Sequence, residues 1–129
     1  MIGYITLGTD DLDRSRTFYD ALLGEIGASR LMEMDSGFTL YGMGWGQPGV
    51  AVTRPNNGEP ARAGNGNMVS LVMDSREKVD RLHAKALALG GSDEGAPGLR
   101  GPEGDRAFYG AYFRDPDGNK LCAFRMGPA

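Results

Sequence analysis

The sequence predicts an α+β fold built from two similar halves. Strand-like and helix-like patterns alternate along the chain, and the order of strand, helix and up to three further strands occurs twice. The 21 glycines stand mainly where these segments end, without forming a repeat. Since 129 residues suffice for one core, we expect a single domain over 1–129, with modules at 1–55 and 66–129 joined by a loop. On this pattern alone, an α+β sandwich whose halves look alike by chance stays open.

The first half is predicted to contain one helix and four strands. β-Branched and aromatic residues over 2–7 indicate the first strand. Asp10 or Asp11 offers an N-cap for a helix over 12–23, whose apolar residues fall on one side. Three short strands then follow, at about 30–34, 38–43 and 49–54.

The second half repeats this order after a loop rich in Pro, Gly and Asn over 55–66. A strand is predicted over 67–73, followed by a helix that Asp74 caps, with Glu77 as the capping-box partner. The stretch after Gly90-Gly91 has no clear pattern. The segments 107–114 and 120–125 then form a hairpin around the turn Asp115-Pro116-Asp117-Gly118-Asn119.

Composition excludes several classes of protein. The net charge of −3 and the absence of a Lys/Arg cluster argue against nucleic acid as a partner. A single cysteine, Cys122, excludes an internal disulfide and a Cys-x-x-Cys motif. No apolar run is long enough to span a bilayer, and no signal core follows the N-terminus. We therefore expect a cytoplasmic protein that binds neither nucleic acid nor a membrane.

Two motifs resemble a known superfamily. The segment 6–19, Thr-Leu-Gly-Thr-Asp-Asp-Leu-Asp-Arg-Ser-Arg-Thr-Phe-Tyr, is similar to the opening of the vicinal oxygen chelate superfamily, which includes glyoxalases, bleomycin resistance proteins and extradiol dioxygenases. The segment 113–119, Phe-Arg-Asp-Pro-Asp-Gly-Asn, is similar to its closing hairpin. The resemblance covers essentially the whole chain and implies two βαβββ modules that form a curved mixed sheet around a cup.

The resemblance also implies where metal ligands would stand. The four positions fall at Tyr4, at Ala51 or Thr53, at Met68 and at Cys122. These side chains are poor ligands for a hard divalent cation, which prefers carboxylates or imidazoles. His83 is the only histidine, so one chain cannot build a site of two histidines and one carboxylate. We therefore expect neither a metal nor another cofactor.

Other chemistry-bearing residues favour structural interpretations. His83 lies on the predicted second helix, away from the strands of the cup, which favours a structural histidine. Cys122 could act as a nucleophile, but no nearby histidine would activate it, and a buried thiol is the simpler interpretation. Gly42, Gly44 and Gly46 do not precede a helix, so they form no dinucleotide-binding motif.

Strand alternation predicts which side chains line the cup. Ile5 and Leu7 suit the face that the helices cover, which leaves Tyr4 and Thr6 for the cup. The same alternation in the later strands gives an aromatic and thioether-rich wall that suits an organic ligand. The predicted ligand-binding residues are Tyr4, Thr6, Met68, Ser70, Tyr112, Arg114, Cys122 and Phe124. The alternative is that they pack a closed core or a dimer interface.

Two functions follow. The first is a binding protein, similar to drug-resistance members of the superfamily, that holds a small organic molecule without chemistry. The acidic balance slightly favours a cationic ligand, although a charge of −3 decides nothing. The second is an enzyme, a glyoxalase-like lyase or a dioxygenase-like member with an altered or metal-independent site. Tyr4, Tyr112 and Cys122 would then be its proton-handling groups. In either case we expect a homodimer.

Overall fold

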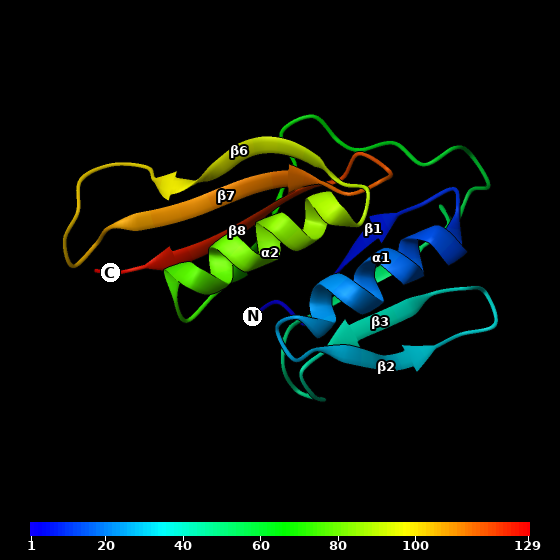
Figure 1. Cartoon of the computed structure of the whole chain (residues 1–129). Helices are drawn as coiled ribbons and strands as arrows, with labels where there is room; N and C mark the ends of the chain where they lie inside the picture. Colours follow the sequence, from blue (N-terminus) through cyan, green and yellow to red (C-terminus); the bar gives the residue numbers. More distant parts are fainter.

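The computed structural model describes residues 1–129 and divides them into two halves, each with one helix and one four-stranded sheet (Figure 1). In the first sheet the strands lie in the order β1-β4-β3-β2, with β1 parallel to β4 and the other pairs antiparallel. The elements of this half are β1 (Tyr4–Gly8), α1 (Leu12–Gly24), β2 (Ser29–Glu33), β3 (Thr39–Gly42) and β4 (Gly49–Thr53).

The second half has the same topology. Its strands lie in the order β5-β8-β7-β6, and β5 runs parallel to β8 as β1 does to β4. Its elements are β5 (Val69–Val72), α2 (Arg76–Ala88), β6 (Ser92–Leu99), β7 (Phe108–Arg114) and β8 (Lys120–Met126). The predicted α+β fold of two βαβββ modules is therefore confirmed.

The curved sheet is divided between the halves. β1 and β5 each form an edge of their own sheet and do not pair with one another, so the chain has two four-stranded mixed sheets. The segment 54–68, which joins β4 to β5, contains neither helix nor strand and crosses from one half to the other (Figure 1).

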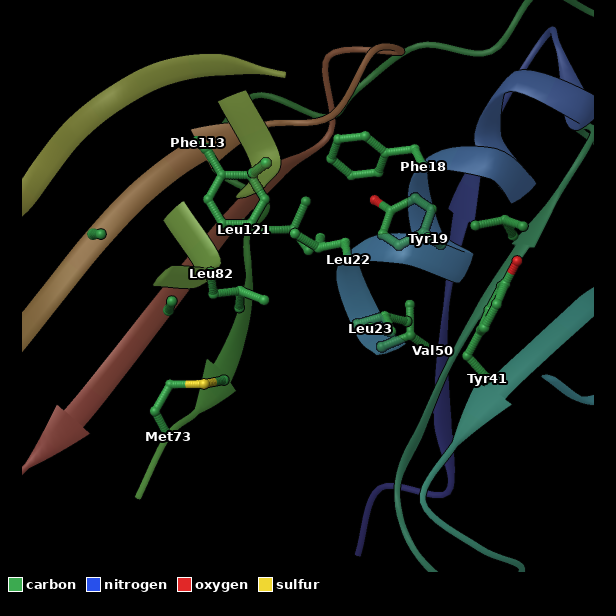
Figure 2. Packing of buried hydrophobic residues seen from close by; sticks show 14 of the residues in the cluster. Phe18, Tyr19, Leu22, Leu23, Tyr41, Val50, Met73, Leu82, Phe113 and Leu121 are labelled. Atoms are coloured by element: carbon green, nitrogen blue, oxygen red, sulfur yellow. The ribbon is translucent and has the colours of Figure 1, made fainter. Parts of the chain in front are cut away.

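One hydrophobic core joins the two halves. Phe18 and Leu22 on α1 belong to the same buried cluster as Leu82 on α2 (Figure 2). Strand residues of both halves, such as Val50 and Phe113, also belong to it. Burying an aliphatic or aromatic side chain of this size contributes roughly 1.5–3 kcal/mol. Each sheet therefore packs one face against the helices, and the helices do not cover its other face. Neither helix combines the length and the apolarity that crossing a bilayer requires.

The caps of the two helices differ in how well the sequence predicts them. Asp11 caps α1 by accepting a hydrogen bond of 3.0 Å from the amide of Arg14, as expected. The prediction that Asp74 caps the second helix is wrong. Ser75 is the N-cap and accepts from the amide of Lys78, while the carboxylate of Asp74 pairs with the ammonium of Lys78 at 2.7 Å.

The stretch without a clear pattern contains β6. Its pairing with β7 shifts register at two places, between Asp93 and Gly95 and between Gly95 and Gly98. Two irregularities in eight residues remove the alternation by which a strand is recognised in a sequence.

Candidate functional site

The candidate site is the face of the sheets opposite the helices, called the cup face below. Ile5 and Leu7 in β1 pack against the core, whereas Tyr4, the first residue of β1, is 55% exposed. In the second half Val69 and Leu71 likewise face the core. Met68, Ser70 and Val72 alternate with them and are exposed, Met68 at 44% and Val72 at 71%. The predicted alternation of side chains is therefore confirmed for β1 and β5.

One row of the cup face crosses three strands of the second half. Ser70 in β5 lies opposite Cys122 in β8, and Cys122 lies opposite Tyr112 in β7. Cys122 is fully buried, and burial raises the pKa of its thiol above the ordinary value. Burial also raises the pKa of Tyr112. Both groups are therefore protonated at neutral pH, so the thiol is a poor nucleophile and the phenol a poor base.

A second row is aromatic. Phe108 and Phe124 stack with ring centroids 5.3 Å apart and an interplanar angle of 6°. Gly110, which lies opposite Phe124 on the neighbouring strand, makes the stack possible. A Cβ at Gly110 would come within 2.6 Å of the Phe108 ring, so any larger residue would displace the ring. The stack presents flat apolar surface at one end of the cup face.

Cations surround Tyr112. The guanidinium of Arg100 lies 5.3 Å from the centre of the Tyr112 ring, and Nζ of Lys120 lies 5.6 Å from it. Arg114, on the same face, donates from Nε to Glu94 at 2.6 Å and from one terminal nitrogen to the carbonyl of Gly118 at 2.8 Å. Its charge is thus neutralised by Glu94, whereas that of Lys120 is not.

A cleft of about 220 Å³ lies between the halves, where the end of β1 meets the beginnings of β5 and β8. It brings together Thr6 and Met68, which the sequence assigns to the site. The segment between β4 and β5 closes it from one side. Its lining is Thr6, Leu7, Gly8, Arg62, Ala63, Gly64, Asn67, Met68, Val69, Asn119 and Lys120.

The predicted residues do not all meet in one cavity of a single chain. Thr6 and Met68 share the cleft, and Ser70, Cys122 and Tyr112 form the row beside it. Phe124 belongs to the aromatic stack, and Arg114 lies at the end of β7. Tyr4 lies in the other half, where its ring packs edge-to-face with that of Phe38, with ring centroids 5.7 Å apart.

Sequence reasoning missed four residues of this surface: Arg62, Arg100, Phe108 and Lys120. Two of them carry a usable signal, because Phe108 has the parity of Tyr112 in β7 and Lys120 has that of Cys122 in β8. Arg62 and Arg100 lie outside any regular alternation, in the connecting segment and after the irregular β6.

The four positions implied as metal ligands do not fit a hard divalent cation. Tyr4 contacts Phe38, Met68 offers a thioether, and the thiol of Cys122 is held protonated by burial. The remaining position falls at Ala51 or Thr53 in β4. The side chain of Ala51 has no donor atom, and Thr53 offers only a hydroxyl. No group of three or more His, Cys, Asp or Glu side chains is arranged to hold a metal ion.

His83 has a structural role. Its side chain is buried on α2, and Nε2 lies 3.0 Å from a carboxylate oxygen of Asp93. Its ring also packs edge-on against Phe113, with centroids 6.4 Å apart. These contacts lie on the helix-covered side of the sheet, as expected, and away from the cup face.

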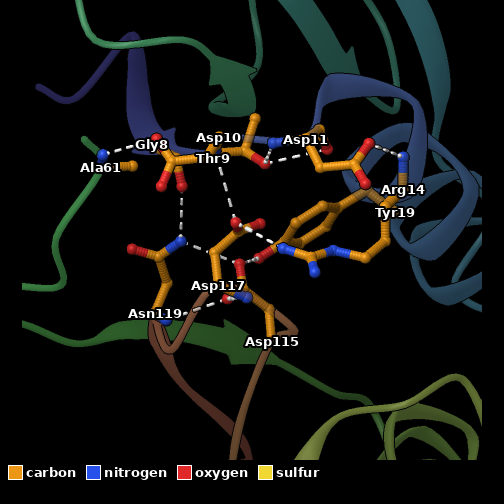
Figure 3. Close-up of polar contacts among 10 residues, drawn as sticks. All are labelled: Gly8, Thr9, Asp10, Asp11, Arg14, Tyr19, Ala61, Asp115, Asp117 and Asn119. Atoms are coloured by element: carbon orange, nitrogen blue, oxygen red, sulfur yellow. Dashed lines mark hydrogen bonds and ion pairs between the residues drawn. The ribbon is translucent and has the colours of Figure 1, made fainter. Parts of the chain in front are cut away.

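The opening motif, residues 6–19, and the closing motif, residues 113–119, contact each other through polar side chains (Figure 3). The amide of Asn119 in the closing hairpin donates to the carbonyl of Gly8 at 3.0 Å. Arg14 at the start of α1 pairs with Asp117 at 2.8 Å. The phenol of Tyr19 donates to the buried carboxylate of Asp115. The motifs therefore fasten the second half to the first beside the cleft.

Comparison with known proteins supports this architecture. A family model described as the glyoxalase/bleomycin resistance protein/dioxygenase superfamily matches residues 1–123. A crystal structure of a glyoxalase/bleomycin resistance protein from Albidiferax ferrireducens T118 is 38% identical, with a TM-score of 0.85 over 98% of this chain and 99% of that one. Among curated proteins, none is similar enough in sequence to count as a match.

More distant structures share the fold alone. A glyoxalase/bleomycin resistance protein/dioxygenase family enzyme from Burkholderia phytofirmans PsJN is 18% identical, with a TM-score of 0.71 over 96% of this chain and 97% of that chain. Lactoylglutathione lyase from Agrobacterium tumefaciens is 20% identical, with a TM-score of 0.65 over 97% of this chain and 92% of that chain.

Proposed function

We propose, from the premise that this chain belongs to the glyoxalase/bleomycin resistance protein/dioxygenase superfamily, that it binds a small organic molecule on the cup face without using a metal ion. The observation that carries the proposal is the side-chain composition of that face. Exposed apolar groups, Met68 and Val72, flank a row of Ser70, Cys122 and Tyr112.

The aromatic surface supports binding of a planar or apolar group. The stacked rings of Phe108 and Phe124, with Val72 beside them, offer a flat wall on which another ring would pack. Covering roughly 200 Å² of apolar surface corresponds to about 5 kcal/mol before the costs of association are subtracted. Ser70 and Thr6 supply hydroxyl groups that would orient the ligand through hydrogen bonds.

Catalysis has less support. The ligand set does not suit a divalent cation, and burial keeps the pKa of both Cys122 and Tyr112 raised. An enzyme would therefore have neither the electrophile nor a ready general base at this face. We favour binding over the lyase-like alternative on this ground.

We also propose that the protein forms a homodimer. β1 and β5 are free edges, and two apolar side chains between β3 and β4, Met43 and Trp45, are 61% and 70% exposed. An interface with a second copy would cover these apolar side chains and give the free edges strands to pair with. A second copy of the chain is the partner that we propose for this surface.

The variant Ser70→Trp tests the proposed binding. Ser70 is exposed on the edge strand β5 and lies beside Cys122, so an indole there would fill the space over the row without entering the core. We expect the variant to unfold at the same temperature as the wild type and to lose binding of the uncharged fluorescent probe N-phenyl-1-naphthylamine. Unchanged probe binding by a folded variant would contradict the proposal.

A further inference from the structure

We propose that the ligand of the cup face is an organic anion. Its charged group would bind Lys120 and Arg62 in the cleft between the halves, and its apolar part would lie along Tyr112 and Phe124. The inference rests on the proposed function, since it names the chemical class of the molecule bound there. It departs from the net charge of −3, which would favour a cation.

The lining of the cleft is positively charged. It contains two cations, Arg62 and Lys120, and no carboxylate. Thr6 and Asn67 add a hydroxyl and an amide as hydrogen-bond donors. Gly64 leaves room for the Asn67 amide, because a Cβ at this position would collide with it. A carboxylate, sulfonate or phosphate group therefore finds donors around it and no carboxylate in the lining.

Neither cation is neutralised by the protein. The ion pairs of the chain include neither Lys120 nor Arg62. Glu59, three residues before Arg62, forms no ion pair with it. Two other carboxylates are paired with arginines. Glu94 is held by Arg114, and Asp117 by Arg14. Charge-assisted hydrogen bonds to a ligand are thus open to both cations, and such bonds are about twice as strong as neutral ones.

Lys120 connects the cleft to the aromatic part of the face. Its side chain is half-buried, it lines the cleft, and its Nζ lies 5.6 Å from the centre of the Tyr112 ring. Arg100 lies 5.3 Å from the same ring. From Lys120, the strand β8 continues on the same face through Cys122 to Phe124. The face is therefore cationic at one end and aromatic at the other, which matches an aromatic anion.

A pair of fluorescent probes separates the charge from the apolar body. 8-Anilinonaphthalene-1-sulfonate and N-phenyl-1-naphthylamine have the same ring system, and only the first carries a sulfonate. Both are titrated into the wild type, into the double variant Lys120→Gln/Arg62→Gln, and into Lys85→Gln. Lys85 is the matched control because it lies on α2, on the other side of the sheet. Circular dichroism and thermal unfolding confirm that each variant folds.

We expect the double variant to bind the sulfonate probe at least about tenfold more weakly, and the uncharged probe as the wild type does. Lys85→Gln should change neither affinity. Added salt should weaken only the sulfonate probe. If the double variant binds both probes equally more weakly, or binds both as the wild type does, the proposal of an anionic ligand is overturned and the proposed function is left intact. Failure of both probes to bind the wild type would overturn both.

Discussion

The phenol of Tyr19 in α1 donates a hydrogen bond of 2.6 Å to Oδ2 of Asp115, which lies 96 residues further along the chain. Both side chains are buried, Asp115 to 4% exposure. The other carboxylate oxygen, Oδ1, accepts from the backbone amides of Asp117 and Asn119, which shapes the turn between β7 and β8. One carboxylate therefore both forms the hairpin turn and fastens it to the first half of the molecule.

Removing the Tyr19 hydroxyl should destabilise the protein. In Tyr19→Phe the ring is kept, but Oδ2 of Asp115 loses one of its two partners in a buried place. Hydrogen bonds to charged groups contribute about 1.5–3 kcal/mol, so we expect a loss of this size in the free energy of unfolding. Urea denaturation measures it.

Tyr41→Phe is the matched control. Its hydroxyl also donates to a carboxylate, that of Asp20 at 2.8 Å, but this carboxylate is partly exposed and already paired with Arg30. Loss of the Tyr41 hydroxyl should therefore lower the free energy of unfolding by less, about 0.5–1.5 kcal/mol. Equal losses in the two variants, or none in Tyr19→Phe, would show that the buried pair does not fasten the halves.

The contribution of Asp115 to the free energy of unfolding should change with pH in the direction opposite to that of a salt-bridged aspartate. Burial raises the pKa of Asp115 above its ordinary value of 3.8, with the hydrogen bonds from Tyr19 and Asn119 opposing the rise. Between 3.8 and the raised pKa, the folded chain binds more protons than the unfolded chain. The contribution of Asp115 to the free energy of unfolding is therefore complete below pH 3.8 and is lost as the pH rises through the folded pKa.

The variant Asp115→Asn isolates this contribution, since it cannot titrate. Urea unfolding of both proteins between pH 3 and pH 7 should show the wild type losing stability relative to the variant as the pH rises through this window. A relative gain by the wild type would mean that the folded pKa lies below 3.8 and that hydrogen bonding outweighs burial.

How far the sequence predicts this molecule depends on the range of the interactions involved. The assignment of Tyr4 and Cys122 to the cup face follows from a period of two along each strand, and neighbouring residues alone decide it. The bond between Tyr19 and Asp115 connects segments that are distant in sequence, so no local pattern indicates it. For the same reason the resemblance of the two motifs to a superfamily predicts their presence but not that they touch.

The site was predicted less completely than the fold. The row of Ser70, Cys122 and Tyr112 follows from alternation, whereas Arg62 and Arg100 reach the site from irregular segments. Long, flexible side chains in such segments have no periodicity that would indicate their direction. The cationic end of the face is therefore visible only in three dimensions.

Purified protein should carry no stoichiometric transition metal. The residues at the four ligand positions supply no imidazole and no carboxylate. Burial raises the pKa of the Cys122 thiol, which opposes the deprotonation that metal binding requires. Elemental analysis after mild dialysis measures the content. One zinc, nickel or iron per chain would contradict the proposed metal-free site and would favour the enzyme alternative.

The chain should sediment as a homodimer at micromolar concentrations. The exposed Trp45 and the free edge of β1 offer the apolar and hydrogen-bonding surface for a second copy. Trp45→Glu should shift the equilibrium toward monomer, because it places a charge where we expect apolar contact. Sedimentation equilibrium that shows only monomer for the wild type across this range would contradict the dimer.

The most direct test of binding at the cup face is a map of the residues that N-phenyl-1-naphthylamine perturbs, measured from amide chemical shifts in nitrogen-15 labelled protein. We predict that the shifts concentrate at Ser70, Tyr112, Cys122 and Phe124, and that the exposed face of α2 around Arg81 stays unchanged. Saturation of these shifts should give the same affinity as fluorescence. Shifts centred on the helices, or none at saturating probe, would contradict the account.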